Sequence, residues 1–480
     1  MSGSNYRDVQ QTNSADAGFP PDLLLDLDRT SRDGLAMQLQ HQLRVGIQQG
    51  RLTAGALLPP SRVLAAQLGV ARSVVVAAYE HLVADGYLTG RRGSGTRVKQ
   101  VAPQAAPRTR QTRNPSVPLG GGLPDAALFP RTEWLRHYRN ALAEVPNSQL
   151  GYPGPFGTHP LREALSDYLA RVRGVAAAPD RMIVTAGITQ GIVLLARALR
   201  ARGCRAIAVE DPCFGFHRDA IARAGLHVEP VPVDEYGLDV DRLAELDVGA
   251  VLVTPAHAYP TGVVLAADRR AALIAWANNR DALIIEDDYD AEFRYDRSPV
   301  GALQGLDPDH VAYAGCVSKT LTPALRLGWM ALPPRLVESV AAEKLYDDMG
   351  NSVLEQLALS RFIGTGGLTR HLRRVRPVYR RRRDAMLAAI NTWMPQTQPT
   401  GIDAGLHVYL RLPSDSNEDA IVATAREQGL RLDGARWNWA DPDSAPPALV
   451  IGYGILGETV IHDSISRLAP ILTRSRVPSC

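Results

Sequence analysis

The sequence lacks long apolar segments and the usual marks of secretion. Its 480 residues contain no run of about 18 consecutive apolar residues, roughly the length that a membrane-spanning helix needs. The first residues, MSGSNYRDVQQTNSADAG, are polar and partly acidic, whereas a signal peptide has a basic start and an apolar centre. We therefore expect no membrane association and a cytoplasmic location.

The chain is also poor in cysteine and in net charge. Its cysteines have neither the short paired spacings of a zinc site nor the density of a disulfide framework, so we expect them to be reduced and predict no metal site. The formal net charge is only +3. A nearly neutral chain can still bind nucleic acid where its positive charge is local. The cysteines are Cys204, Cys213, Cys316 and Cys480.

What is present is enough sequence for about three domains, with a hydrophobic content of 45% that can fill large cores. Residues 99–117 are rich in Pro, Ala, Gln and Arg and show no apolar periodicity, which is typical of a linker. The arginines in this segment either contact DNA phosphates or keep the tether soluble. The linker separates a short N-terminal part from a long C-terminal part.

The N-terminal part has the pattern of a helix-turn-helix. Apolar residues recur at helical spacing over residues 35–52, and Pro59 and Pro60 then mark a turn. A short helix follows, for which we expect Ser61 to be the N-cap, and Gly69 marks the next turn. A second helix begins near Arg72 and Ser73 and ends near Gly86, and its N-terminal side chains are placed to enter a major groove.

Residues 87–98, YLTGRRGSGTRV, predict two short strands around a glycine-rich tip that carries arginines. Such a wing reaches the phosphate backbone of DNA. Any single arginine here is more often a solvated surface charge, but their alignment in one winged helix favours DNA contact. The candidate DNA-binding residues are Arg62, Arg72, Ser73, Arg92, Gly93 and Arg97.

The C-terminal part contains a lysine placed for covalent chemistry. Residues 313–318 read as a buried strand that ends just before Lys319. A lysine whose proton is lost through burial or a neighbouring cation can form a Schiff base with a carbonyl compound. Ser318 and Arg326 are then candidate phosphate ligands. A lone lysine at a strand end is usually only a solvated cap, so the neighbouring strands decide its interpretation.

Three other strand ends carry suitable chemistry. The strand IIEDDYD at 284–290 ends in acidic residues, which makes Asp287 a candidate partner for a pyridinium nitrogen and Tyr289 for a phenolic oxygen. Residues 251–262, VLVTPAHAYPTG, form a Pro- and Gly-punctuated loop of the kind that closes over a ligand at a parallel sheet's carboxyl edge. Phe214 follows another strand and could stack on an aromatic cofactor, although a lone phenylalanine is more often core.

A phosphate cradle is predicted at residues 183–191, where an apolar strand enters a Gly- and Thr-containing turn before a helix. Backbone N–H groups at a helix start bind phosphate readily. The residues of this cradle are Gly187, Ile188 and Thr189, with an ordinary strand-to-helix turn as the plain alternative.

Along the chain the motifs follow the order phosphate turn, aromatic residue, acidic strand end and lysine. In that order they resemble those of the fold type I pyridoxal 5'-phosphate enzymes, the aminotransferase-like superfamily. The resemblance implies a Schiff base on Lys319, a pyridinium salt bridge to Asp287, a phenolic contact from Tyr289 and ring stacking by Phe214. It also implies phosphate contacts from residues 187–189, Ser318 and Arg326. The aminotransferase-like domain then spans residues 118–480, with a large domain at about 150–345 and a small domain from 118–149 and about 346–480.

The N-terminal part resembles the winged helix of the GntR family, through LPPSR, GVARSVV and GYLTGRRGSGTRV within residues 22–98. Ala71 stands where that family commonly has Ser or Thr, which removes a side-chain cap worth about 1 kcal/mol. The sequence therefore predicts a multidomain α/β protein, in which a winged helix-turn-helix precedes the two aminotransferase-like domains.

A GntR winged helix joined to an aminotransferase-like domain resembles the MocR/GabR family of bacterial transcription regulators. Further landmarks are GLPDAALFP at 122–130, GYPGPFGTHPLREAL at 151–165 and EDDYDAEFRYD at 286–296. The resemblance implies a head-to-tail homodimer on double-stranded DNA with two half-sites. It also implies an effector that is pyridoxal phosphate, alone or with an amine or amino acid, and control of vitamin B6 or amine metabolism, as in PdxR-like members.

Two functions remain, because an active aminotransferase with a DNA-binding appendage would share most of these motifs. Catalytic aminotransferases hold the substrate carboxylate with an arginine that aligns near Val450, where this chain reads ALVIGYG. No arginine lies between Arg436 and Arg467. The missing bidentate anchor favours the regulator and the vitamin B6 type of effector. The arginine-rich segment 369–386 is interpreted as the solvated face of a helix that Pro377 bends or interrupts.

Overall fold

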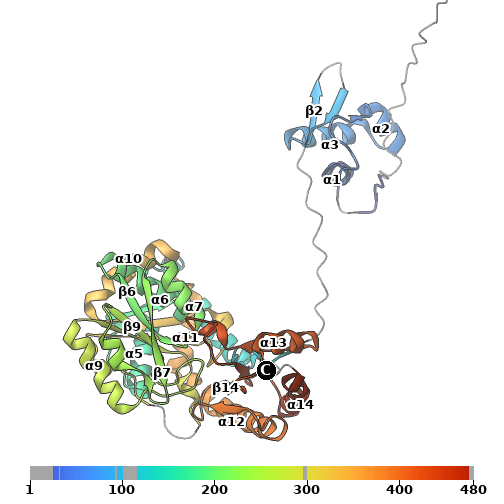
Figure 1. The fold of residues 1–480 in the computed structure, drawn as a ribbon. Coiled ribbons are helices and arrows are strands. Elements are labelled where there is room, and N and C mark those ends of the chain that lie inside the picture. The colour runs from blue at the N-terminus through green and yellow to red at the C-terminus, as the bar shows by residue number, and fades with distance from the viewer. Residues whose placement is uncertain (1–24, 32, 92–94, 101–115, 296–299, 475–480) are drawn as a thin grey trace, which may run out of the picture. The chain divides into compact units, whose positions relative to one another are not determined.

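The computed structural model describes residues 25–31, 33–91, 95–100, 116–295 and 300–474. The chain forms two compact units, Met1–Thr112 and Arg113–Cys480. Figure 1 shows both, and each is described by itself below. Within the described residues, no helix combines the length and the apolar character that crossing a membrane would require.

The first unit is a winged helix. Its three-stranded antiparallel sheet has the order β1-β3-β2, and the predicted wing strands are confirmed as β2 and β3. Buried residues such as Leu39, Leu43, Val75 and Leu82 lie at helical spacing and form its core. The elements are α1 (Leu35–Gln48), β1 (Leu57–Leu58), α2 (Ser61–Leu68), α3 (Arg72–Ala84), β2 (Leu88–Arg91) and β3 (Gly95–Val98).

The helix ends correct one expectation and confirm two. Pro60, and not Ser61, is the N-cap of α2, because the Pro60 carbonyl already accepts hydrogen bonds from the backbone N–H groups of Val63 and Leu64. The predicted turn at Gly69 is confirmed, since this glycine ends α2 in the left-handed conformation at φ 63°. The N-cap of α3 is Ala71, which provides no side-chain cap.

The second unit is built on an eight-stranded sheet with the order β5-β12-β11-β10-β9-β6-β7-β8. The central pairs are parallel, and β12 and β8 run antiparallel to their neighbours. Strands β9, β10 and β11 are buried throughout, as strands covered on both faces require. The strands are β5 (Met182–Thr185), β6 (Ala206–Asp211), β7 (His227–Asp234), β8 (Gly237–Leu238), β9 (Ala250–Val253), β10 (Leu283–Asp288), β11 (Val311–Cys316) and β12 (Gly328–Ala331).

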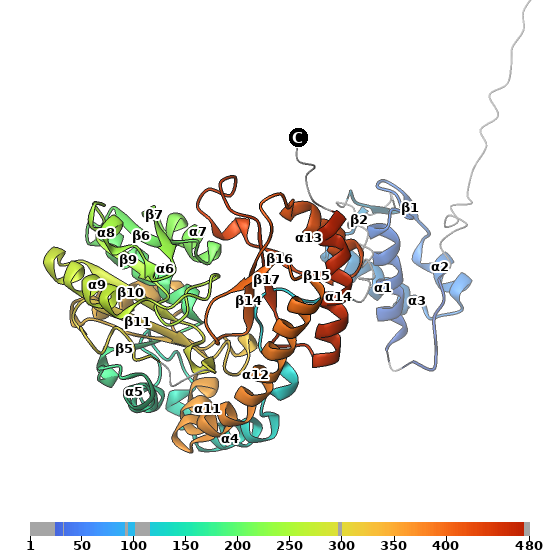
Figure 2. The ribbon, with the colours of Figure 1, turned by 60° about the horizontal axis from the view of Figure 1, so that its bottom comes forward.

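Helices cover both faces of this sheet (Figure 2). On one face α6 and α10 pack against the strands through residues such as Ile192 and Val340. On the other, Leu273 and Trp276 of α9 join a separate core. The helices associated with the sheet are α5 (His159–Arg173), α6 (Ile188–Ala201), α7 (Gly215–Arg223), α8 (Val240–Ala244), α9 (Ala267–Arg280), α10 (Pro334–Asp348) and α11 (Val353–Gly364).

A smaller part of this unit has its own antiparallel sheet of order β13-β14-β17-β16, and β15 pairs with β4. The apolar segments 405–412 and 448–456 contain β14 and β17. The strands are β4 (Val117–Pro118), β13 (Gln398–Thr400), β14 (His407–Arg411), β15 (Leu430–Arg431), β16 (Asp433–Gly434) and β17 (Ala448–Gly452). The accompanying helices are α4 (Arg131–Glu144), α12 (Gly367–Trp393), α13 (Glu418–Glu427) and α14 (Glu458–Arg474).

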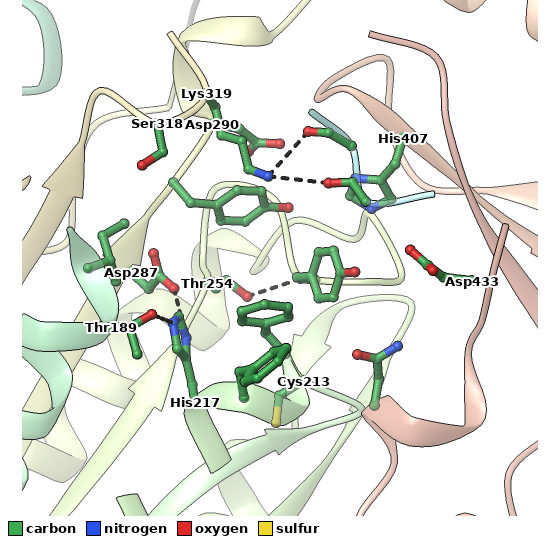
Figure 3. Close-up of a pocket in the computed structure, with 18 of the residues that line it drawn as sticks. Thr189, Cys213, His217, Thr254, Asp287, Asp290, Ser318, Lys319, His407 and Asp433 are labelled. Atoms are coloured by element: carbon green, nitrogen blue, oxygen red, sulfur yellow. Dashed lines mark hydrogen bonds and ion pairs between the residues drawn. The ribbon is translucent and has the colours of Figure 1, made fainter. Parts of the chain in front are cut away.

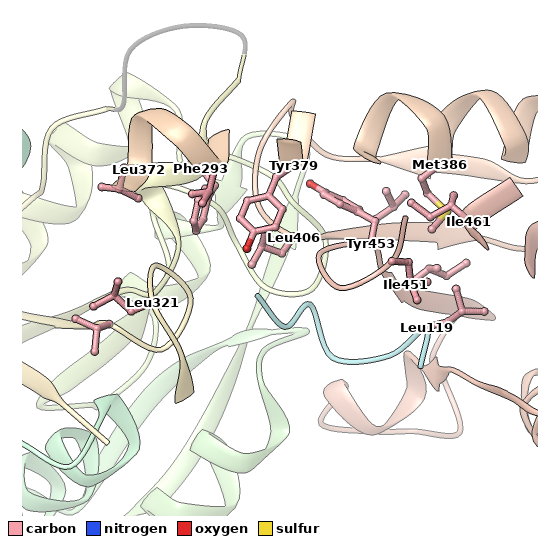
Figure 4. Packing of buried hydrophobic residues seen from close by; sticks show 14 of the residues in the cluster. Leu119, Phe293, Leu321, Leu372, Tyr379, Met386, Leu406, Ile451, Tyr453 and Ile461 are labelled. Atoms are coloured by element: carbon pink, nitrogen blue, oxygen red, sulfur yellow. The ribbon is translucent and has the colours of Figure 1, made fainter. Parts of the chain in front are cut away.

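One hydrophobic cluster joins the two sheets. It includes Phe293 and Leu321 from the larger part and Tyr379, Leu406 and Tyr453 from the smaller part (Figure 4). The phenyl ring of Phe293 lies edge-on against Tyr379, with 5.2 Å between ring centroids. The two parts therefore share a core, which fixes the edge of the large sheet against the small sheet.

The arginine-rich helix α12 is continuous through Pro377, so the expected interruption does not occur in the helix assignment. Most of its arginines bind partners within the unit, which accounts for an arginine-rich face without nucleic acid. The pairs are Arg370 with Glu133, Arg374 with the Leu128 carbonyl, Arg381 with Glu458, Arg382 with Asp125, and Arg383 with Asp403.

Candidate functional site

A cavity of about 650 Å³ lies at the carboxyl ends of the central strands, where the small sheet faces the large one (Figure 3). This edge of a parallel α/β sheet is where ligands usually bind. All the residues predicted to contact a cofactor line it: Gly187, Ile188, Thr189, Phe214, Asp287, Tyr289, Ser318, Lys319 and Arg326. That they bind a cofactor stays a prediction, but the structure brings them together from five separate chain segments.

Lys319 lies three residues beyond the end of β11, with its side chain inside the cavity. Its Nζ donates hydrogen bonds to the carbonyl oxygens of Gly122, at 3.2 Å, and Gly121, at 3.4 Å (Figure 3). Burial lowers the pKa of the Lys319 ammonium. A lowered pKa increases the fraction of neutral amine, the form that attacks carbonyl carbons.

Asp287, near the end of β10, provides a buried negative charge with spare bonding capacity. Its side chain is almost fully buried, and Oδ2 lies 3.4 Å from Nδ1 of His217. Oδ1 has no hydrogen-bond partner. A buried carboxylate oxygen without a donor is costly, so this atom suits a ligand that brings an N–H group.

His217 was not predicted from the sequence, although it stands in the first turn of α7, three residues after Phe214. Its Nε2 lies 3.2 Å from the hydroxyl of Thr189, while Nδ1 faces Asp287. This histidine therefore connects the turn at the start of α6 with the carboxylate at the end of β10. A histidine beside a short helix start was the available signal, but it is too weak to interpret alone.

The turn before α6 has the form of an anion cradle. Gly187 has φ 103°, and a Cβ at this position would lie 3.1 Å from a guanidinium nitrogen of Arg326. The side-chain oxygen of Gln190 accepts from the backbone N–H of Ala186 at 2.7 Å. No side chain caps the N-terminus of α6. A helix start with an adjacent guanidinium is a ready site for phosphate.

Aromatic rings form one wall of the cavity. Phe214 meets Tyr259 edge-on, with ring centroids 5.3 Å apart. Burial raises the pKa of Tyr289 well above its usual value, so its hydroxyl remains protonated. That hydroxyl lies 3.0 Å from Nδ1 of His257, which in turn lies 3.0 Å from Asp290. His257, Tyr259 and Asp290 were not predicted as site residues, although the loop that carries the first two was.

Two further ionisable groups in the cavity have strongly shifted pKa values. Burial raises the pKa of Glu210 to about 7, and the backbone N–H and hydroxyl of Thr254 donate to its carboxylate. Burial also lowers the pKa of His407 to about 4, so its imidazole is neutral near pH 7. The cavity therefore contains fewer fixed charges at neutral pH than its composition suggests.

The structure also shows what stands at the position of the missing arginine. Val450 of β17 is fully buried and packs with Tyr409, Ala435 and Ala448. Among the described residues that line the cavity, Lys319 is the only lysine and Arg326 is the only arginine. An amino acid bound here would therefore have no guanidinium beyond Arg326 to hold its carboxylate.

In the winged helix, the described candidates for DNA contact are all exposed. Arg72 begins α3, and its Nε lies 3.4 Å from the hydroxyl of Ser61. Arg97 donates to the Gly55 carbonyl at 3.0 Å. The described candidates are Arg62, Arg72, Ser73 and Arg97, whereas Arg92 and Gly93 lie outside the described residues.

Comparisons with known proteins support the class of fold found in each unit. Residues 35–98 match the bacterial regulatory proteins of the gntR family, and residues 125–421 match aminotransferase class I and II. The chain is 35% identical to the HTH-type pyridoxine biosynthesis transcriptional regulator PdxR of Corynebacterium glutamicum, over 92% of this chain and 96% of the relative. It is 30% identical to the probable rhizopine catabolism regulatory protein MocR of Rhizobium meliloti, over 93% and 95%.

Among solved structures, a multiple substrate aminotransferase from Thermococcus profundus superimposes with a TM-score of 0.70 at 25% identity. The superposition covers 78% of this chain and 96% of the aminotransferase chain. The fold and the comparisons together define a DNA-binding transcription regulator, in which a winged helix precedes a fold type I aminotransferase-like domain. The chain belongs to the MocR/GabR family of such regulators.

Proposed function

We propose that this regulator senses pyridoxal 5'-phosphate, alone or joined to an amine or amino acid, and controls genes of vitamin B6 or amine metabolism. The observation that carries the proposal is the unpartnered Oδ1 of Asp287 in the same cavity as Lys319. A pyridine ring nitrogen that carries a proton would satisfy this oxygen. The relative PdxR is a regulator of pyridoxine biosynthesis, which supports the vitamin B6 assignment.

The residues of the cavity fit the proposed cofactor at each end. The turn of Gly187, Ile188 and Thr189, with Ser318 and Arg326, would hold the phosphate. Asp287 would hold the ring nitrogen, Phe214 would stack on the ring and Tyr289 would contact the phenolic oxygen. When bound, pyridoxal phosphate would supply an aldehyde to which Lys319 or an incoming primary amine can be joined.

Sensing, rather than turnover, is the proposed role of the cavity. The carboxylate-binding arginine of catalytic aminotransferases aligns near Val450, which is buried among apolar side chains here, so α-amino acids would lack their strong anchor. An assay with amino donors and keto acids tests this point. Rapid turnover by the purified protein would show that the domain is a working aminotransferase.

On the DNA side, we propose that the exposed residues of α2, α3 and the wing bind double-stranded DNA in the cytoplasm. Arg62, Arg72, Ser73 and Arg97, together with Arg92 and Gly93, are the proposed contacts. A head-to-tail homodimer would present two winged helices to two half-sites, whose spacing would follow from the dimer's geometry.

The proposal is tested by titrating the full-length protein onto the DNA upstream of its own gene, at stated salt, with and without pyridoxal phosphate. Covalent attachment is measured in parallel by mass spectrometry after borohydride reduction. We expect specific DNA binding whose affinity changes with the cofactor, and attachment at Lys319.

In the variant Lys319→Ala we expect no covalent attachment and no cofactor response, while DNA binding without cofactor persists because Lys319 lies in the second unit. Lys99→Ala is the matched control for covalent attachment, since this lysine is exposed and outside the cavity. An unchanged cofactor response in Lys319→Ala would overturn the covalent-sensor proposal. Attachment at Lys319 without specific DNA binding would overturn the proposed link between cofactor and operator.

A further inference from the structure

The proposed cofactor contacts leave one end of the cavity without an assigned role. The lining residues outside the proposed contacts include Leu123, Phe216, Val422, Leu432, Asp433 and Trp437, and we call the part of the cavity that they line the mouth. Phe216 and Trp437 meet edge-on with ring centroids 4.8 Å apart, and both are partly exposed, at 60% and 44%. The mouth is therefore an open, mainly apolar space with an aromatic wall.

The charges of the cavity are unevenly distributed between its two ends. Its described acidic lining residues are Glu210, Asp287, Asp290 and Asp433. Asp287 is assigned to the ring nitrogen, Asp290 pairs with His257, and Glu210 accepts two hydrogen bonds from Thr254. Asp433 is thus the acidic side chain of the described lining that neither the proposed cofactor nor a side-chain partner shown in the structure accounts for.

The lysine and the arginine of the described lining both lie outside the mouth. Lys319 and Arg326 both belong to the proposed cofactor contacts, and the described mouth residues include no lysine, arginine or histidine. Asp433 belongs to the short strand β16 at the edge of the small sheet, and it enters the cavity from the side opposite Asp287 (Figure 3). The guanidinium of Arg431, which is not part of the cavity lining, partly offsets the rise that burial causes in the pKa of Asp433. Within the described lining of the mouth, a carboxylate would meet Asp433 and no cation, whereas an ammonium would meet a carboxylate and aromatic faces.

We propose that the effector recognised in the mouth is a linear diamine, whose distal ammonium binds Asp433 beside Phe216 and Trp437. This inference rests on the proposed function, because it assumes that pyridoxal phosphate occupies the other end of the cavity. It narrows the effector from amines and amino acids in general to amines with a cationic distal end.

Asp433 also has a structural contact that the test must preserve. The backbone N–H of Gly121 donates to its carboxylate, and Gly121 belongs to the segment whose carbonyls accept from Lys319. Asp433→Asn retains an oxygen that can accept this hydrogen bond and removes only the charge. Glu427→Gln is the matched control, because Glu427 is exposed at the end of α13 and does not line the cavity.

The experiment uses the full chain loaded with pyridoxal phosphate and three ligands with the same four-carbon skeleton. These are putrescine, butylamine and γ-aminobutyrate, which end in an ammonium, a methyl group and a carboxylate. Affinity is measured by calorimetric titration, and cofactor loading is measured first for each variant. We expect wild type and Glu427→Gln to bind putrescine most tightly and γ-aminobutyrate most weakly.

In Asp433→Asn we expect the preference for putrescine over butylamine to fall by about two- to fivefold, as for a partly exposed ion pair. Asp433→Lys should bind γ-aminobutyrate better than putrescine, because the charge at the mouth is then reversed. If loaded wild type prefers γ-aminobutyrate, or if Asp433→Asn keeps the full preference for putrescine, the inference is wrong and the proposed function stands. If wild type binds no pyridoxal phosphate, the proposed function itself fails.

Discussion

The two units differ in how deeply they bury their candidate binding residues, although Thr189 and Arg326 of the cavity are exposed. In the winged helix the candidates within the described residues are exposed, and Arg72 makes only a long 3.4 Å contact with Ser61. In the second unit Asp287 is almost fully buried, and Lys319 bonds to a carbonyl 197 residues away in the sequence. We therefore expect substitutions on the DNA-binding surface to leave stability unchanged, whereas substitutions in the cavity should affect both binding and packing.

The largest expected effect is at the buried carboxylate. Asp287→Asn removes the charge that the cofactor's ring nitrogen would meet, and we expect the affinity for pyridoxal phosphate to fall about 10- to 150-fold, or roughly 1.5–3 kcal/mol. Equilibrium dialysis of the two proteins measures this change. Asp281→Asn, exposed just before the start of the same strand, should leave the affinity unchanged. Equal affinities for wild type and Asp287→Asn would contradict the assignment of Asp287.

The corresponding change in the winged helix is Arg72→Ala at the start of α3. We expect DNA affinity to fall by roughly 1–3 kcal/mol if Arg72 contacts a base, with relaxed preference at one position of the site. Fluorescence anisotropy with operator variants measures both effects. Arg51→Ala is the control, because this exposed arginine bonds to Gln49 after the end of α1. A lowered melting temperature in Arg72→Ala would weaken the contrast between the units.

A paired change on α12 tests whether its arginines stabilise the fold. Arg382 is mostly buried and donates to Asp125 at 2.8 Å, so Arg382→Ala should destabilise the protein by about 1–3 kcal/mol. Arg373 is exposed and shows no hydrogen bond or ion pair in the structure, so Arg373→Ala should stay within about 0.5 kcal/mol of wild type. Urea denaturation measures both. Reduced DNA binding in Arg373→Ala would instead indicate a second nucleic-acid surface.

The smallest expected effect depends on pH. The folded pKa of Glu210, about 7, lies above its usual value of 4.5, so the stability it contributes is present below pH 4.5 and lost as pH rises through 7. Glu210→Gln cannot ionise. We therefore expect the variant to lose less stability than wild type between about pH 5 and 8, by on the order of 1 kcal/mol. Denaturation curves across this range measure the difference, and exposed Glu427→Gln should follow wild type.

Much of the fold could be predicted because its signals are local. Apolar periodicity predicted the helix that begins at Leu35, and buried apolar runs predicted β10 and β11. The predicted N-cap of α2, Ser61, was wrong by one residue, because the sequence does not show which carbonyl accepts the first helical hydrogen bond. The interruption at Pro377 was also not found, since packing on both sides of a long helix can keep it continuous.

The residues of the site also divide into those that the sequence predicted and those that it did not. Lys319, Asp287 and the turn at Gly187 could be named because each follows an apolar strand, and the carboxyl ends of neighbouring parallel strands share one sheet edge. His217, His257 and Asp433 carry no such local signal.

The sequence by itself determined the two domain classes, their order along the chain and the strand-end residues that face a common cavity. Only the tertiary structure decided which other side chains reach that cavity, which of its acids are paired and how Val450 is packed. The physical reason is that burial and pairing depend on segments far apart in the chain. Glu210 and Thr254 bond across 44 residues, and Asp433 meets Gly121 just beyond the paired strands β15 and β4, which come from opposite ends of the second unit's sequence.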